Sequence, residues 1–174
     1  MTDSIKVRFD DAEVLARLRE LRDRLSDSRM ATVFREIGED LVESTKHRFS
    51  TSAGPDGARW PALAESTVLQ MVARLRGAVG KNGRLTQKGT VAVANRRPLV
   101  ETGMLRDTIR YRLLANGVEV GTNRFSGEWE GGAAVHQFGS RDGRIPARPF
   151  LGLSADDRTT VLQIADRYLR RLPR

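Results

Sequence analysis

The sequence predicts an α+β domain in which an N-terminal helical hairpin and a C-terminal helix pack on a small antiparallel sheet. Three observations support this prediction. Apolar residues recur at helical spacing near both ends of the chain, an Asn-Gly pair separates two alternating segments, and the 174 residues contain no internal repeat or long polar linker. We therefore expect residues 1–174 to form a single domain, which is long enough to bury a core without disulfides.

Two amphipathic helices are expected near the N-terminus, joined as a hairpin. In both, apolar residues recur three or four positions apart, which places them on one face of a helix. Asp10 or Asp11 supplies the cap of the first helix, and the second helix continues to Phe49 over about five turns. The apolar positions are Val14, Leu18, Leu21 and Leu25 in the first helix and Met30, Val33, Phe34, Ile37 and Leu41 in the second.

The clearest hairpin lies at 109–120, where apolar and polar residues alternate on both sides of Asn116-Gly117. Asn-Gly is the pair that most favours a two-residue turn between antiparallel strands. A third helix is expected at about 62–76, and a short helical or turn element at 99–105.

The closing helix is expected to begin after a capping box at 154–157. Leu162 and Leu169 lie off its main apolar stripe. A helix that is apolar on two sides has two partners, so these leucines predict either another subunit or a wide core face.

A short strand is expected at residues 5–9. Ile5, Val7 and Phe9 alternate there with two basic residues, the period-two pattern of a strand with one buried face.

A basic excursion occupies about 77–97, and its four glycines and five positive charges cannot build a core. We expect a mobile loop or a β-arm that runs through Val91 and Val93. No acid occurs between Glu65 and Glu101, whereas seven lysines and arginines do. Such a segment attracts polyanions, although a solvated loop would have the same composition.

Composition argues against an enzyme. The chain has no cysteine and only two histidines, so disulfides and thiolate metal sites are excluded. His47 is expected on a helix four residues after Glu43, where a Glu-His contact or a solvated side chain explains it. His136 lies in a small apolar turn as a packed, hydrogen-bonded residue, and neither histidine has a second histidine nearby on its own element. We expect no catalytic residue, no cofactor, no metal and no contact with a membrane.

The run Ile145-Pro-Ala-Arg-Pro-Phe150 is stiff, because each proline fixes its own φ and extends the residue before it. It would hold Phe150 in a packed position and present the guanidinium of Arg148 to a carboxylate. Both a core role and an interface role are open for Phe150 and for Trp60.

Several of these fragments, taken in order, resemble the phage virion morphogenesis family, the tail completion proteins of tailed bacteriophages and prophages. The likeness runs from about residue 30 to the C-terminus. It is carried by Pro55-Asp-Gly57 with Trp60 and Ala62-Leu63, Thr67, the run Leu99-Val-Glu-Thr-Gly-Met-Leu105, His136-Gln-Phe-Gly139, and Ile145-Pro-Ala-Arg-Pro-Phe-Leu-Gly-Leu153. The structural motif residues are then Pro55, Gly57, Gly103, His136, Phe138, Gly139, Pro146 and Pro149.

The resemblance implies a non-enzymatic structural protein that acts in tail completion and head-tail joining. It implies assembly in the host cytoplasm and a place in the virion, at the neck or the head-proximal end of the tail. Its partners would be copies of itself in a homo-oligomeric ring, with a hexamer as the candidate, and neighbouring neck, tail tube or terminator proteins, with DNA close by in the channel. The candidate interface residues are Trp60, Arg84, Lys88, Arg96, Arg97, Arg148 and Phe150.

The alternative function is nucleic-acid binding by the basic segment 74–97. That segment has no aromatic residue on which a base could stack and no recognisable reading motif.

Overall fold

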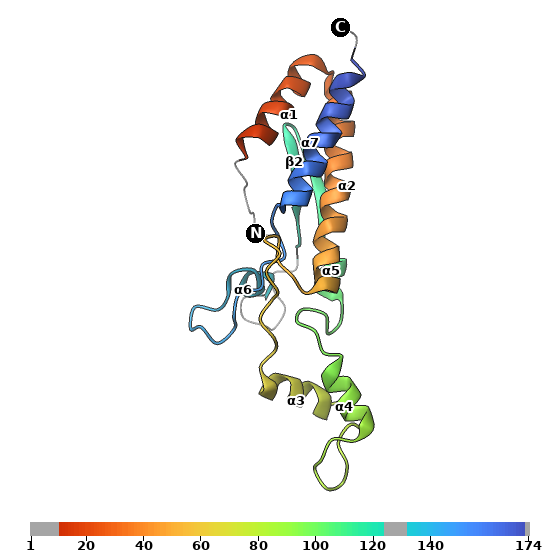
Figure 1. Cartoon of the computed structure of the whole chain (residues 1–174), viewed down its shortest axis with the longest axis vertical. Helices are drawn as coiled ribbons and strands as arrows, with labels where there is room; N and C mark the ends of the chain where they lie inside the picture. Colours follow the sequence, from red (N-terminus) through yellow and green to blue (C-terminus); the bar gives the residue numbers. More distant parts are fainter. Residues whose placement is uncertain (1–10, 124–131, 173–174) are drawn as a thin grey trace.

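The computed structural model describes residues 11–123 and 132–172 of the chain. The described part is an elongated body with a smaller lobe at the end opposite the C-terminus (Figure 1). The strand expected at 5–9 lies outside the described residues. The elements are α1 (Ala12–Arg24), α2 (Asp27–Thr51), α3 (Glu65–Ala73), α4 (Gln87–Ala94), α5 (Met104–Asp107), β1 (Arg110–Leu114), β2 (Gly117–Gly121), α6 (Gly132–Phe138) and α7 (Ala155–Arg170).

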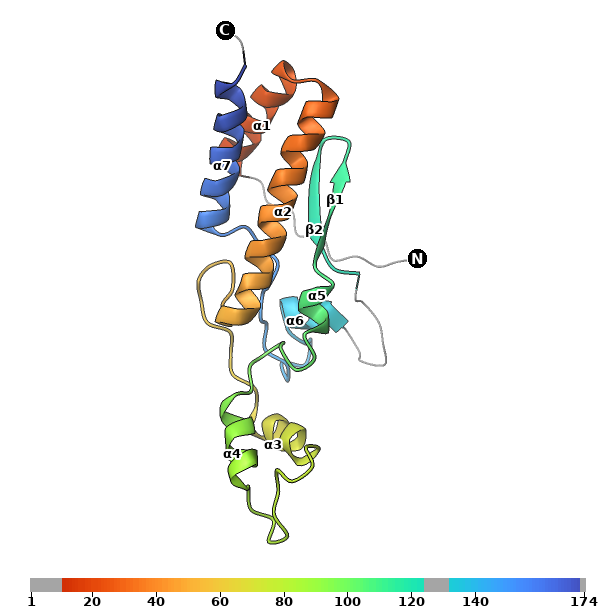
Figure 2. The same cartoon turned by 90° about the vertical axis from the view of Figure 1, so that its right-hand side faces the viewer.

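Helix α2 is the central element of the body, since α1, α7 and the β1–β2 hairpin all pack against it (Figure 2). The predicted α+β class is confirmed. Helix α2 has 25 residues, about seven turns, and is therefore longer than the sequence suggested. It ends at Ser52, which adopts a left-handed conformation with φ 53°.

The expected caps are present at α1 and α7. The side chain of Asp11 accepts hydrogen bonds from the amides of Glu13 and Val14. At α7, Ser154 and Asp157 form the predicted capping box, each side chain accepting from the other residue's backbone amide. These bonds satisfy amides that a helix start otherwise leaves unpaired.

The first core cluster joins the three long helices. Its buried members are Val14, Leu21 and Leu25 of the first helical segment, Met30, Val33, Phe34 and Ile37 of α2, and Val161, Ile164 and Ala165 of α7. Leu162 and Leu169 pack against this cluster while partly buried. In the structure, Leu162 and Leu169 therefore belong to a wide core face of α7.

The β1–β2 hairpin is antiparallel, and its register pairs Tyr111 with Val120 and Leu114 with Gly117. It approaches α2 closely at Gly38. A Cβ at position 38 would lie 2.7 Å from Cγ of Tyr111 and 2.9 Å from a methyl carbon of Val118. The close contact between α2 and the hairpin thus depends on a glycine, which has no side chain, at position 38.

The excursion at 77–97 differs from the expected β-arm. Val91 and Val93 lie in α4, and α3 packs on α4 to form the lobe (Figure 1). An isolated bridge between Val79 and Leu85 is the β-structure found there. Thr86 caps α4 by accepting from the amide of Gly89, so a hydroxyl three residues before a glycine outweighed the β propensity of the valines.

The apolar turn expected around His136 was also wrong, because residues 133–138 belong to helix α6. The third helix is confirmed with shorter bounds. Helix α5 overlaps the end of the short element expected at 99–105 and extends two residues beyond it. In the described ranges, no helix is long and apolar enough to cross a membrane.

We predict that Gly38→Ala lowers the free energy of unfolding by about 1–3 kcal/mol, the usual cost of overpacking. Helix propensity alone would give the opposite sign, a gain of roughly 0.5–1 kcal/mol. Urea unfolding of the variant measures the difference. Gly117→Ala is the control, because no atom lies within 4 Å of a Cβ added there. Stabilisation by Gly38→Ala would contradict the close contact.

Candidate assembly surface and its support

A second core cluster lies where α2, the loops and α6 meet. Its buried members are Phe49, Trp60, Ile109, Ala133, Phe150 and Leu151. The ring of Phe49 lies edge-on to that of Trp60, with centroids 5.4 Å apart, and 5.6 Å from the ring of Phe150. These aromatic pairs stabilise the cluster beyond the area they bury.

Segment 147–153 crosses this cluster without helix or strand structure, and Gln137 of α6 fixes its position. The Gln137 carbonyl oxygen accepts from the amides of Phe150 and Leu151, both at 3.0 Å, and its amide donates to the carbonyl of Leu151 at 2.9 Å. All these groups are buried. The buried backbone groups of Phe150 and Leu151 thus find hydrogen-bond partners on a side chain, where a β-sheet would supply them from a neighbouring strand.

Arg48 of α2 holds the same segment from the other side. Its guanidinium donates to the carbonyls of Phe150 and Gly152 at 2.8 and 2.9 Å, and it forms a buried ion pair with Asp157. Burial lowers the pKa of Arg48, and the carboxylate of Asp157 opposes that shift. The sequence analysis did not identify Arg48 as a functional residue. The one sequence feature that could have done so is the position of this charged residue on the apolar face of α2.

The predicted site residues Trp60, Arg148 and Phe150 are all part of this buried centre. Arg148 is 4% exposed and donates to the carbonyls of Pro61 and Ala62, both at 2.8 Å. Trp60 donates from its indole to the carbonyl of Pro149 at 2.9 Å. Their polar groups therefore have partners within the chain, and burial lowers the pKa of Arg148.

Most of the structural motif residues lie at or beside the same centre. Pro55 lies against Gly152, where an added Cβ would come within 2.3 Å of its ring. The carbonyl of His136, in α6, accepts from the amide of Arg148 at 2.7 Å. Gly57, Gly103 and Gly139 have φ of 77°, 69° and 83°, and Gly57 is exposed. The fragments that carry the sequence resemblance thus meet largely at this centre, although Thr67 lies exposed in α3 of the lobe.

The remaining site residues lie on the outside. Arg84, Lys88 and Arg97 are exposed and Arg96 is half-buried, all four in or beside the lobe. Lys88 donates to the carbonyl of Arg76, and Arg97 donates to the carbonyl of Ser50 at the end of α2. Phe138, expected as a structural residue, is 63% exposed.

A turn at 139–145 projects beside Phe138 and is stiffened by its own bonds. The amide of Ser140 donates to the carbonyl of Ile145 at 2.9 Å, and the hydroxyl of Ser140 accepts from the amide of Ile145 at 2.8 Å. Arg141 and Arg144 are exposed on this turn. We call Phe138 together with residues 139–147 the arm. It and the lobe are the two projections of the described chain.

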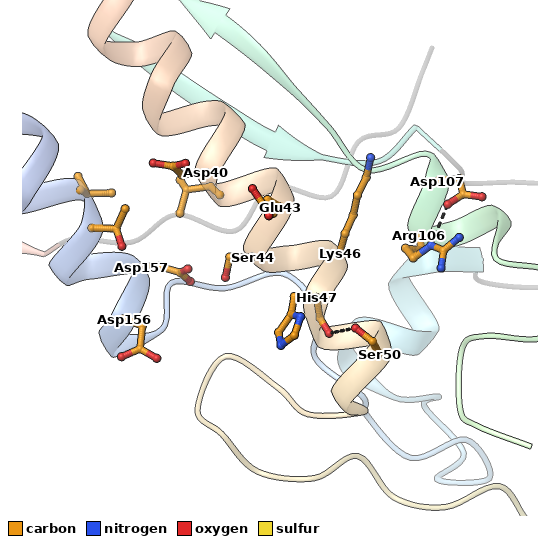
Figure 3. A pocket seen from close by; sticks show the side chains of 13 residues that line it. Asp40, Glu43, Ser44, Lys46, His47, Ser50, Arg106, Asp107, Asp156 and Asp157 are labelled. Carbon is orange, nitrogen blue, oxygen red and sulfur yellow. Dashed lines mark hydrogen bonds and ion pairs between the residues drawn. The ribbon is translucent and has the colours of Figure 1, made fainter. Parts of the chain in front are cut away.

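A groove of 770 Å³ lies between α2, α5 and α7 (Figure 3). Asp40, Glu43 and Asp156 line it, and burial together with neighbouring glutamates raises the pKa of Asp40. The hydroxyl of Ser50 donates to the backbone carbonyl of His47 rather than to its ring. Among the described residues that line this groove, no serine is paired with a histidine ring.

The described chain thus has a packed, loop-built centre that supports two exposed projections, the lobe and the arm. The chain matches the phage virion morphogenesis family over residues 9–170 and belongs to it. Over 80 residues it is 40% identical to the Mu-like prophage FluMu G protein 2 of Haemophilus influenzae. That alignment covers 43% of this chain and about half, 54%, of the relative. No solved structure matches the chain.

We predict that Arg48→Met lowers the free energy of unfolding by about 3–5 kcal/mol, because it leaves the buried carboxylate of Asp157 without its cationic partner. The double variant Arg48→Met/Asp157→Asn should lose less than the single variant, since the unpaired charge is gone while the amide oxygen of Asn can still accept from the amide of Ser154 in the α7 cap. Chemical denaturation measures both, and Arg35→Met, at an exposed position of the same helix, is the control. A double variant as unstable as the single one would contradict the ion-pair account.

We also predict a loss of stability in mild acid that depends on His136. Burial, followed by the charge of Arg148, lowers the pKa of His136 below its ordinary value of 6.5, and its Nδ1 is buried without a hydrogen-bond partner in the described structure. Below about pH 6.5 the unfolded chain therefore binds a proton at His136 that the folded chain does not. The free energy of unfolding consequently decreases as the pH is lowered.

His136→Gln should flatten the dependence of unfolding free energy on pH between about 7 and 5, whereas His47→Gln, at the other and exposed histidine, should not. Equal slopes for the two variants would contradict this assignment.

Proposed function

We propose that this protein acts in tail completion and head-tail joining, as a subunit of a ring at the neck or the head-proximal end of the tail. Membership of the virion morphogenesis family supports a structural role in building the particle. The observation that carries the finer proposal is the arrangement of the family motifs. Most of them meet at the buried centre, and the lobe and the arm that project from it supply exposed contact surfaces.

The lobe and the groove of Figure 3 carry side chains of opposite charge, so they are suited to contact each other between two subunits. The lobe carries Arg84 and Lys88, whereas the groove of Figure 3 carries Asp40, Glu43 and Asp156 on the body. A head-to-tail contact between such surfaces closes into a ring if the rotation between subunits allows it. Arginine and aromatic residues at such contacts carry much of the binding energy, as Phe138 would.

DNA binding by the lobe is the second candidate. No acid lies between Glu65 and Glu101, and the lobe, which carries the exposed Arg84 and Lys88, lies at one end of the elongated body (Figure 1). Phosphate contacts of this kind would make affinity fall steeply with salt.

One variant pair tests both functions. Arg84→Ala/Lys88→Ala should stay folded but should fail to complete joining of purified heads and tails, whereas Arg19→Ala/Arg29→Ala removes the same charge from exposed body positions and should join normally. Light scattering should give the wild-type protein a mass that is a multiple of 19.4 kDa. A monomer at every concentration that also fails to join tails would contradict the ring.

The same variants separate the DNA candidate. Tight binding of duplex DNA by the isolated protein, weakened by salt and lost in Arg84→Ala/Lys88→Ala but kept in the control, would favour it over protein contacts. Joining that fails in the lobe variant without any measurable DNA binding would favour contacts between proteins.

A further inference from the structure

Two turns at the ends of the projections have the same design. Residues 80–85, between α3 and α4, read Gly-Lys-Asn-Gly-Arg-Leu, and residues 140–145 of the arm read Ser-Arg-Asp-Gly-Arg-Ile. Each turn thus has a cation, an Asn or Asp, a glycine, an arginine and a branched aliphatic residue in the same order. The first, which we call the lobe turn, lies at the far end of the lobe (Figure 1), and the second is the arm turn.

The hydrogen bonds of the two turns also agree. The amide of Gly83 donates to the carbonyl of Gly80 at 3.0 Å, and the amide of Gly143 donates to the carbonyl of Ser140 at 3.1 Å. In each turn the Asn or Asp side chain accepts from the amide of the arginine two residues later, at 3.1 Å in both. Gly83 and Gly143 have φ of 73° and 72°. These local bonds, which Asn and Asp favour in turns, hold the tip of each projection in one shape.

Both turns expose apolar side chains among cations. Leu85 is 39% exposed and Ile145 37%, and beside them lie the exposed Val79 and Phe138. Of the nine large apolar residues exposed in the described ranges, these are four, and they lie within two short segments. Phosphate contacts do not need aliphatic groups, whereas contacts between proteins bury them, so these tips are suited to a protein partner. The exposed cations of the turns are Lys81, Arg84, Arg141 and Arg144.

A site of matching chemistry lies on the body, in the groove of Figure 3. The exposed carboxylates of Glu43 on α2 and Asp156 at the start of α7 line it, together with the apolar side chains of Leu41 and Val161. Neither carboxylate is in an ion pair with another described residue, because the ion pairs at the groove use other acids. The groove volume of 770 Å³ is within the range of binding sites, roughly 300–1,000 Å³.

From these observations we infer that the lobe turn and the arm turn are equivalent binding elements, each of which fits the groove of Figure 3 in a second copy of this chain. Leu85 or Ile145 packs on the apolar lining, and the cations of the turn lie beside the two carboxylates. Neither turn lines the groove of its own chain, so the two partners are separate copies.

The inference rests on the ring proposed above and adds that each copy offers two turns for one groove. A closed ring therefore fills every groove with one turn. The other turn of each copy is left for the next component of the particle.

Charge reversal followed by rescue tests the inference. In Glu43→Lys/Asp156→Lys the groove repels the cations of both turns, so the dissociation constant of self-association, measured by sedimentation equilibrium, should rise roughly tenfold or more. Adding Lys81→Glu/Arg84→Glu to this variant should restore association to within about fivefold of the wild type.

Equivalence of the turns gives a second prediction in the same reversed-groove variant. Adding Arg141→Glu/Arg144→Glu in place of the lobe-turn change should restore association to the same extent. Adding Arg19→Glu/Arg29→Glu, which makes the same change of charge at exposed body positions, should not. Each variant should keep the wild-type urea midpoint, because all the changed side chains are exposed.

Rescue by both turns but not by the control supports the inference. Rescue by neither turn, by one alone, or by the control as well would overturn it and would leave the ring proposal standing. A wild-type chain that is monomeric at every concentration would overturn both. Wild-type protein that associates but does not join purified heads and tails would count against the proposed function alone, because the rescue measures self-association only.

Discussion

The fold depends on segment 147–153 being held from three sides. Gln137 pairs with its backbone from α6, Arg48 pairs with it from α2, and Trp60 donates to it from the loop after α2. Within the described part of the chain no strand pairs with this segment, and its buried backbone groups bond to side chains. Because these side chains come from positions far apart in the sequence, fixing the segment also fixes how α2, α6 and α7 lie relative to one another.

This constraint separates the chain into a part that sets the shape and exposed parts that we propose as contact surfaces. The aromatic and guanidinium groups of Trp60, Phe150 and Arg148 are used to hold the centre, although their types are those that also dominate interfaces. The exposed charges of the lobe and the exposed Phe138 of the arm remain for contacts outside the described chain. For an assembly protein, the stiffness of the centre reduces the ordering cost of each contact made by the projections.

Local patterns in the sequence predicted the helices except α4 and α6, the caps of α1 and α7, and the hairpin, because these depend on residues within a few positions of one another. They failed at α4, where a capping threonine and the packing of Gly89 against Ala78 outweigh alternating valines. They also failed for Arg48 and Gln137, whose partners lie 102 and 13 residues away. No spacing rule links such positions. The family resemblance identified the segments that meet, but only the structure shows that they meet one another.

Asp157 performs two tasks with one carboxylate, since the same oxygen that accepts from the amide of Ser154 also faces Arg48. The start of α7 is therefore locked to the middle of the protein in register as well as in position. A slip of that helix by one residue along α2 would break the ion pair, because the cap fixes the carboxylate of Asp157 relative to the start of α7. A force applied to the C-terminal helix would consequently pass directly into α2, and through it to the hairpin, instead of being absorbed by the loop before α7.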